Sequence, residues 1–231
     1  MIKEKKDQED LIYISSQLSK LLKKSFGKGP DSCFSILHQN MLFVNLRQFT
    51  TPAEEVLLFK KEKSFALKFR SIILQSVFEK FKPEMKKTLS LEFDSFFHDW
   101  NYDTNSGFIL FTKKTKTANQ TGKLDRLKNQ YLEESIFNCY SETYKTPQSI
   151  DLWKINNNLI MAKCHDILLP IEKELFRQGH YELLYNHLVE IKYSIIEHKR
   201  NFSFSLDREI IDMFLVWDYD LNNNYLILYL K

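Results

Sequence analysis

The sequence predicts an α+β protein made of two tandem copies of one unit, each in the order α-β-β-α-α-β-β. A repeated phrase carries this prediction: Trp-Asn-Tyr-Asp-Thr-Asn at residues 100–105 returns as Trp-Asp-Tyr-Asp-Leu-Asn at residues 217–222. Similar helical and strand-like patterns precede both phrases. Short connections between strands favour antiparallel pairing, so we expect a four-stranded antiparallel sheet with helices on one face in each copy. We also expect the copies to pack as a pseudo-dimer.

The first copy is predicted over residues 1–113. Apolar residues recur every three or four positions from Leu11 to Leu22, which indicates a helix that ends at Gly27-Lys28-Gly29-Pro30. Strands are expected at 33–37 and 41–46. Thr51-Pro52-Ala53-Glu54 is typical of a helix start, with Glu54 on a solvated face. A short helix to about residue 60, a longer one over 64–81, and strands near 91–101 and 107–113 complete the copy.

Residues 114–123 are polar and are predicted to link the copies. The second, diverged copy is predicted over 124–231, with a helix at 124–144 and a hairpin at 149–166. A short helix begins at Pro170 and a longer one spans 180–199. Final strands are expected at about 209–218 and 224–231.

Composition places the chain among globular proteins. Of 231 residues, 43% are hydrophobic and 27% are charged, with only five glycines and five prolines. Three cysteines without paired spacing favour a reducing compartment. The charged N-terminus is followed by no apolar signal core, and no apolar run is long enough to span a bilayer. We therefore expect a cytoplasmic protein with no transmembrane segment of its own.

Charge is distributed unevenly. Residues 1–116 hold 20 Lys and Arg against 14 Asp and Glu (+6), whereas residues 117–231 hold 13 against 16 (−3). The lysine clusters of the first half could contact anionic lipid headgroups or simply keep exposed faces soluble. Nucleic acid is not an expected partner, because aromatic residues are not interleaved with the lysines and no helix-turn-helix spacing is present.

The first copy resembles a bacterial family. Gly27-Lys28-Gly29-Pro30, Thr51-Pro52-Ala53-Glu54, Arg70 within the long helix, Lys82-Pro83 and Asp103 before the last strand are similar to the DUF2294 or MpsC-like family. That family is named after the sodium-translocating membrane-potential-generating system. The resemblance covers about residues 10–113. The second copy keeps Pro147, Pro170 and Glu172, but it has Tyr144-Lys145-Thr146 in place of the glycine loop and His187 or a neighbour in place of Arg70.

This resemblance implies an intracellular protein associated with a membrane system that is linked to ion transport and bicarbonate supply. It implies a membrane transport subunit as partner, with the protein at the inner face of the membrane. It transfers no catalytic residues. Whether the chain also forms a homo-oligomer stays open.

Six residues are the candidates for binding a ligand or partner: Arg70, Trp100, Asp103, Trp217, Asp220 and Lys28. Arg70 borders an apolar helical stripe, where it could pair with a carboxylate or hold an anion such as bicarbonate. Lys28 lies in a glycine loop that could cradle a phosphate, although the loop ends a helix and is better suited to a structural turn. The two repeated phrases could form a half-buried sheet edge or an aromatic ledge with one carboxylate in each copy.

No catalytic or metal constellation is expected. Cys164-His165-Asp166 lies on a predicted strand, where neighbouring side chains point to opposite faces. We therefore predict a non-enzymatic accessory or regulatory protein of a membrane ion or bicarbonate transport system that acts by protein–protein binding and uses no cofactor. The alternative is a small-molecule or anion sensor, or an enzyme, with a site between the two copies.

Overall fold

The computed structural model describes residues 2–113 and 127–231 and divides the chain into two compact units, Met1–Gly122 and Lys123–Lys231. The expected linker at 114–123 lies outside the described residues. The elements of the first unit are α1 (Ile2–Phe26), β1 (Ser32–His38), β2 (Met41–Arg47), α2 (Pro52–Phe59), α3 (Lys63–Leu89), β3 (Ser95–Asn101) and β4 (Ser106–Thr112).

The elements of the second unit follow the same order with one addition. They are α4 (Gln130–Thr143), β5 (Ser149–Asn156), β6 (Leu159–His165), α5 (Pro170–Arg177), α6 (Tyr181–Glu197), α7 (Lys199–Leu206), β7 (Ile210–Asp218) and β8 (Asn223–Leu230). The predicted α+β class and the two similar halves are confirmed.

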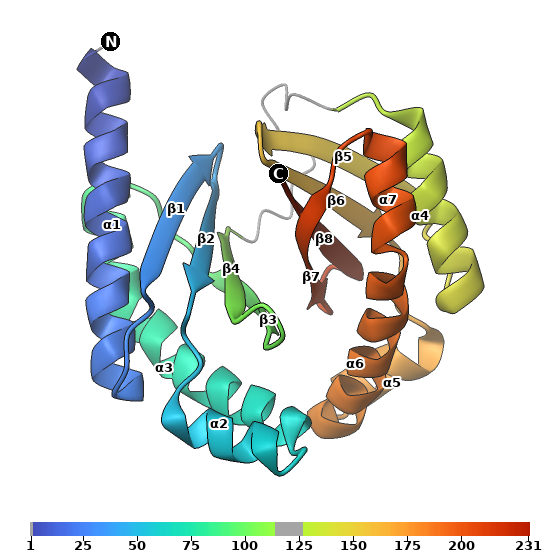
Figure 1. Ribbon diagram of the computed structural model, residues 1–231, viewed down its shortest axis with the longest axis horizontal. Coiled ribbons are helices and arrows are strands. Elements are labelled where there is room, and N and C mark those ends of the chain that lie inside the picture. Colours follow the sequence, from blue (N-terminus) through green and yellow to red (C-terminus); the bar gives the residue numbers. More distant parts are fainter. Residues whose placement is uncertain (1, 114–126) are drawn as a thin grey trace. The chain divides into compact units, whose positions relative to one another are not determined.

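Each unit contains a four-stranded antiparallel sheet with matching strand order, β1-β2-β4-β3 in the first and β5-β6-β8-β7 in the second. In the first unit α1 packs on α3 and β1, and Figure 1 shows both helices on one side of that sheet. In the second unit α4 packs on α6 and α7. Each sheet thus buries one face under its own helices, which is the standard solution for a two-layer α+β unit.

Helix α3 runs through Pro83 to Leu89, past the predicted end at residue 81. Burial of Phe78, Phe81 and Met85 along one face stabilises the helix on both sides of the proline. The corresponding stretch of the second unit bends at His198 and continues as α7, which the sequence analysis did not predict. Polar residues dominate α7, and fully buried Phe202 fixes it to the core of the second unit.

Candidate functional site

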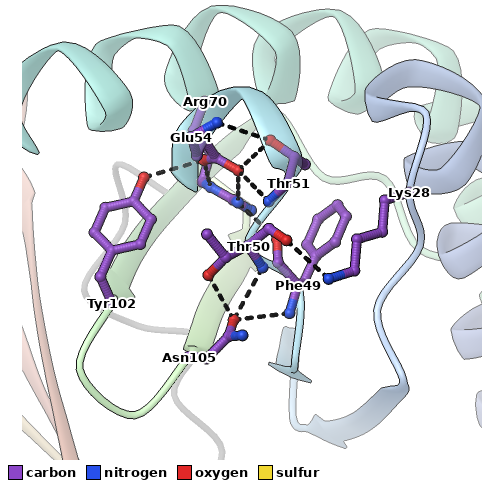
Figure 2. A network of polar contacts seen from close by, with 8 residues as sticks. All are labelled: Lys28, Phe49, Thr50, Thr51, Glu54, Arg70, Tyr102 and Asn105. Atoms are coloured by element: carbon purple, nitrogen blue, oxygen red, sulfur yellow. Dashed lines mark hydrogen bonds and ion pairs between the residues drawn. The ribbon is translucent and has the colours of Figure 1, made fainter. Parts of the chain in front are cut away.

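A buried salt bridge between Glu54 of α2 and Arg70 of α3 lies at the centre of a polar network in the first unit (Figure 2). Both side chains are fully buried. The Arg70 Nε donates to Glu54 Oε1 at 2.6 Å, and Nη2 donates to Glu54 Oε2. This bidentate pairing matches the planar guanidinium to the carboxylate. It offsets much of the free energy that is needed to remove both charges from water.

The other hydrogen-bonding positions of Glu54 are also used. Thr51 donates to Oε2 from its backbone N–H at 2.9 Å and from its hydroxyl at 2.7 Å. Tyr102 donates its hydroxyl to Oε1 at 3.0 Å. The Thr51 hydroxyl in turn accepts from the Glu54 N–H at 3.4 Å, which completes a capping box at the start of α2. Glu54 therefore joins the start of α2, the middle of α3 and the turn after β3.

Arg70 is enclosed mainly by aromatic rings. Its guanidinium carbon lies 3.7 Å from the centre of the Trp100 ring and 4.8 Å from that of Phe49. Nη2 also donates to the Phe49 carbonyl at 2.7 Å, whereas Nη1 has no hydrogen-bond partner among the described residues. Stacking on aromatic faces stabilises a desolvated cation. Arg70 is therefore held by packing against the rings as well as by its salt bridge with Glu54.

The loop between β2 and α2 is fixed by two further side chains. The Asn105 Oδ1 accepts from the backbone N–H groups of Phe49 and Thr50, both at 2.9 Å, and from the Thr50 hydroxyl at 2.7 Å. Lys28 donates its ammonium to the Thr50 carbonyl at 2.9 Å. Lys28 thus joins the end of α1 to this loop, as Figure 2 shows.

The second unit contains a weaker version of the network around buried Glu172. Leu169 donates its N–H to Glu172 Oε2 at 2.6 Å, but a leucine cannot supply the hydroxyl that Thr51 supplies. Tyr144 donates its hydroxyl to the same oxygen. In place of the arginine stands His187, whose Nε2 lies 3.1 Å from Glu172 Oε1 and whose side chain is 51% exposed. A fully buried arginine is therefore replaced by a half-exposed histidine.

The loop contacts are repeated more faithfully than the salt bridge. The Asn222 Oδ1 accepts from the Leu168 N–H at 2.8 Å, and Lys145 donates to the Leu168 carbonyl at 3.2 Å. These contacts correspond to those that Asn105 and Lys28 make in the first unit. The duplication therefore extends from sequence to specific hydrogen bonds.

Two tyrosines of these networks are affected by their surroundings. Burial, followed by the nearby Glu54 carboxylate, raises the pKa of Tyr102. Burial and the hydrogen bond to Glu172 raise the pKa of Tyr144. Both phenols consequently stay protonated and act as donors to their glutamates over the physiological pH range.

The structure brings together some of the six candidate residues. Arg70 and Trp100 are stacked, and Lys28 lies in the same network. Asp103 lies in the exposed turn after β3, where its N–H donates to Asn101 Oδ1. Trp217 packs edge-on against Tyr144, with ring centres 5.6 Å apart, and Asp220 lies in the exposed turn after β7.

Several members of the first network were not predicted as site residues, and their side chains include those of Thr51, Glu54, Tyr102 and Asn105. The expectation that Glu54 lies on a solvated face is wrong, because Arg70 and Tyr102 cover it. The signals were present in the sequence, since Glu54 occupies the third helical position of a capping box and Asn105 recurs as Asn222.

The described residues form neither a metal-binding cluster nor a membrane-spanning helix. Within 2–113 and 127–231, no three or more His, Cys, Asp or Glu side chains gather as a metal ion would require. In the same ranges, no helix has the length and apolar character needed to cross a bilayer.

Comparison with protein families identifies the first unit. Residues 9–114 match the family model described as "Na+-translocating membrane potential-generating system (MpsC)". Searches of curated proteins and of solved structures found no match. The matched stretch contains Lys28, Glu54, Arg70, Trp100 and Asn105, so the whole polar network of the first unit lies inside it. Residues 9–114 of the first unit are therefore an MpsC-like domain.

Proposed function

We propose that this protein is a non-enzymatic accessory or regulatory component of a membrane ion or bicarbonate transport system and that it acts by binding a subunit of that system. The observation that carries the proposal is the family match over residues 9–114, whose description names a sodium-translocating membrane-potential-generating system. The family description gives the context, and the binding role is our inference.

The geometry of the polar network supports a binding role over a catalytic one. Every acceptor position that Glu54 offers to the network is occupied by a donor from its own chain. Arg70 is fully buried against aromatic rings. A buried ion pair whose carboxylate is fully hydrogen-bonded has its main effect on the position of the elements that it joins. We infer that the network holds α1, α2 and α3 in a fixed arrangement for contact with a partner.

The proposed contact surface is the basic end of α1. Lys20, Lys23 and Lys24 are exposed there and are followed by the loop that Lys28 fixes to Thr50. Exposed charges of one sign accelerate association with an oppositely charged partner and contribute to specificity. The surplus of positive charge in residues 1–116 agrees with a partner whose exposed loops are acidic.

The test is co-purification of the full chain with co-expressed ion-translocating subunits of such a system in neutral detergent. We expect recovery of the complex at low salt, and loss of it for the double variant Lys20→Glu/Lys24→Glu. The matched control reverses two exposed lysines of the second unit, Lys128→Glu/Lys154→Glu, and should retain the complex. No recovery with the unmodified chain, or equal loss in both variants, would contradict the proposed function.

One observation favours an anion-binding function as the second candidate. Arg70 Nη1 is buried without a hydrogen-bond partner among the described residues, and leaving such a donor unsatisfied is costly. A bound bicarbonate or phosphate would satisfy it. Thermal denaturation with increasing bicarbonate and phosphate tests this candidate, since an anion at 100 times its Kd should stabilise the fold by roughly 2.7 kcal/mol. A shift that persists in Arg70→Lys would count against Arg70 as the anion site.

A further inference from the structure

The bend between α2 and α3 exposes large apolar side chains beside lysines. We call Val56, Phe59, Lys60, Lys61 and Phe65 the α2–α3 corner. Phe59 is 90% exposed, Phe65 57% and Val56 56%. Single exposed apolar residues are ordinary on protein surfaces, but these three are grouped around one three-residue bend.

The corner is an ordered part of the first unit. The N–H of Lys60 donates to the Val56 carbonyl at 3.1 Å, and that of Lys61 donates to the Leu58 carbonyl at 2.9 Å. The salt bridge between Glu54 and Arg70 connects the start of α2 to α3. Phe59 therefore lies at the end of a firmly held helix, α2. In Figure 1 this helix is at the lower edge of the first unit.

The backbone at Lys61 is unfavourable for a lysine. Lys61 has a φ of 62°, in the left-handed region that glycine adopts most readily. The corresponding bend of the second unit places Gly179 there, with a φ of 77°. A glycine at position 61 would relieve the steric cost of the Cβ atom, so this backbone conformation does not require a lysine there.

The two bends also differ in charge. From Glu55 to Lys68 the first unit carries four lysines (60, 61, 63 and 68) and two glutamates (55 and 62). The bend of the second unit has Gln178 and Gly179 in place of Lys60 and Lys61, and Arg177 there is paired with Glu174. The second unit keeps an exposed apolar residue, Leu183, at the third position of α6, as Phe65 is at the third position of α3.

We propose that the α2–α3 corner docks on the surface of an anionic lipid bilayer. Phe59 and Phe65 would enter the boundary between headgroups and acyl chains, and Lys60 and Lys61 would contact lipid phosphates. Aromatic and apolar side chains combined with lysines are the features that hold peripheral segments at a membrane interface. A lipid surface fits better than a protein groove because Phe59, the most exposed aromatic side chain of the corner, lies at the end of its helix directly beside Lys60 and Lys61.

Docking on a lipid bilayer needs no protein partner, so it can be tested independently of the function proposed above. The experiment is co-sedimentation of the full chain with vesicles of phosphatidylcholine alone and of phosphatidylcholine mixed with phosphatidylglycerol. We expect binding to the anionic vesicles only, weakened by added salt. Phe59→Ser should weaken binding by about tenfold or more, because it removes the most exposed apolar side chain of the corner.

Two further variants separate docking from folding. Lys61→Gly should weaken vesicle binding several-fold while urea unfolding shows equal or greater stability. Leu183→Ser, at the position of the second unit that corresponds to Phe65, should leave vesicle binding unchanged. Equal binding to both vesicle types, or no effect of Phe59→Ser, would overturn the proposal. If vesicles are not bound and Phe59→Ser instead abolishes co-purification with the transport subunits, the corner docks on protein and the lipid assignment is wrong.

Discussion

Trp100 of β3 lies directly against Gly107 of β4, its partner across the strands. A Cβ atom at residue 107 would come within 2.1 to 2.5 Å of three atoms of the indole ring. The same ring carries the Arg70 guanidinium at 3.7 Å. The absence of a side chain at Gly107 therefore lets Trp100 take the position in which it supports the buried arginine.

The second unit has no glycine at the corresponding position. Asn224 occupies the position paired with Trp217, and its side chain is fully buried. Trp217 is only partly buried and packs edge-on against Tyr144. The carboxylate of Glu172 is then paired with half-exposed His187 rather than with a buried arginine. A single difference in a strand thus accompanies the change at the salt bridge, whereas the loop contacts of Asn222 and Lys145 are kept.

Gly107→Ala should destabilise the protein by about 1–3 kcal/mol, because the added methyl group forces Trp100 out of its position. Urea unfolding monitored by tryptophan fluorescence measures this loss. Trp100→Leu in the same chain should make Gly107→Ala nearly neutral. If the two substitutions instead destabilise additively, the clash with Trp100 is not the cause.

Arg70→Met should lower the free energy of unfolding by about 3–5 kcal/mol, since it leaves the Glu54 carboxylate buried without its cation. Adding Glu54→Gln should recover part of that loss, which a double-mutant cycle detects.

His187→Gln provides the comparison in the second unit. Its cost should stay below about 1 kcal/mol, because the His187 side chain is half exposed and solvent weakens its interaction with Glu172. Equal costs for Arg70→Met and His187→Gln would contradict this account.

Tyr144→Phe should destabilise the protein more than Tyr102→Phe does. Without the Tyr144 hydroxyl, Glu172 Oε2 keeps only the hydrogen bond from the Leu169 N–H among the described residues. Glu54, by contrast, keeps its hydrogen bonds from Arg70 and Thr51 when the Tyr102 hydroxyl is removed. A hydrogen bond to a charged group contributes about 1.5–3 kcal/mol, so we expect a loss in that range for Tyr144→Phe. Thermal and urea unfolding of both variants test the order, and the reverse order would refute the assignment of donors.

Stability should fall at alkaline pH. Burial raises the pKa of the Cys139 and Cys164 thiols to about 12, above the value of about 8.5 expected in an unfolded chain. Between these values the unfolded chain releases protons that the folded chain retains, so the free energy of unfolding decreases as pH rises. Unfolding curves from pH 7 to 10 measure the slope. Cys139→Ala/Cys164→Ala should show a shallower slope, and an unchanged slope would assign the effect to other groups.

Much of the architecture could be predicted from sequence because it follows from local patterns. The repeated phrase at Trp100 and Trp217 indicated the duplication, and Pro52 and Pro170 marked the starts of α2 and α5 correctly. The order of strands and helices follows from hydrophobic periodicity, which depends on neighbouring residues alone. Helix α7 was not predicted because it is stabilised by Phe202, which packs against core residues that are far from it in the sequence.

The candidate site divides in the same way. Sequence indicated Arg70, Trp100 and Lys28, because an arginine beside an apolar stripe and a repeated tryptophan are visible along the chain. Tertiary structure alone decided that Glu54 is buried, since its partners Arg70 and Tyr102 lie 16 and 48 residues away. A carboxylate at a helix start has the same local sequence whether water or an arginine surrounds it. The sequence therefore determined the duplicated fold, and the packing of α2 on α3 determined which charges form its buried centre.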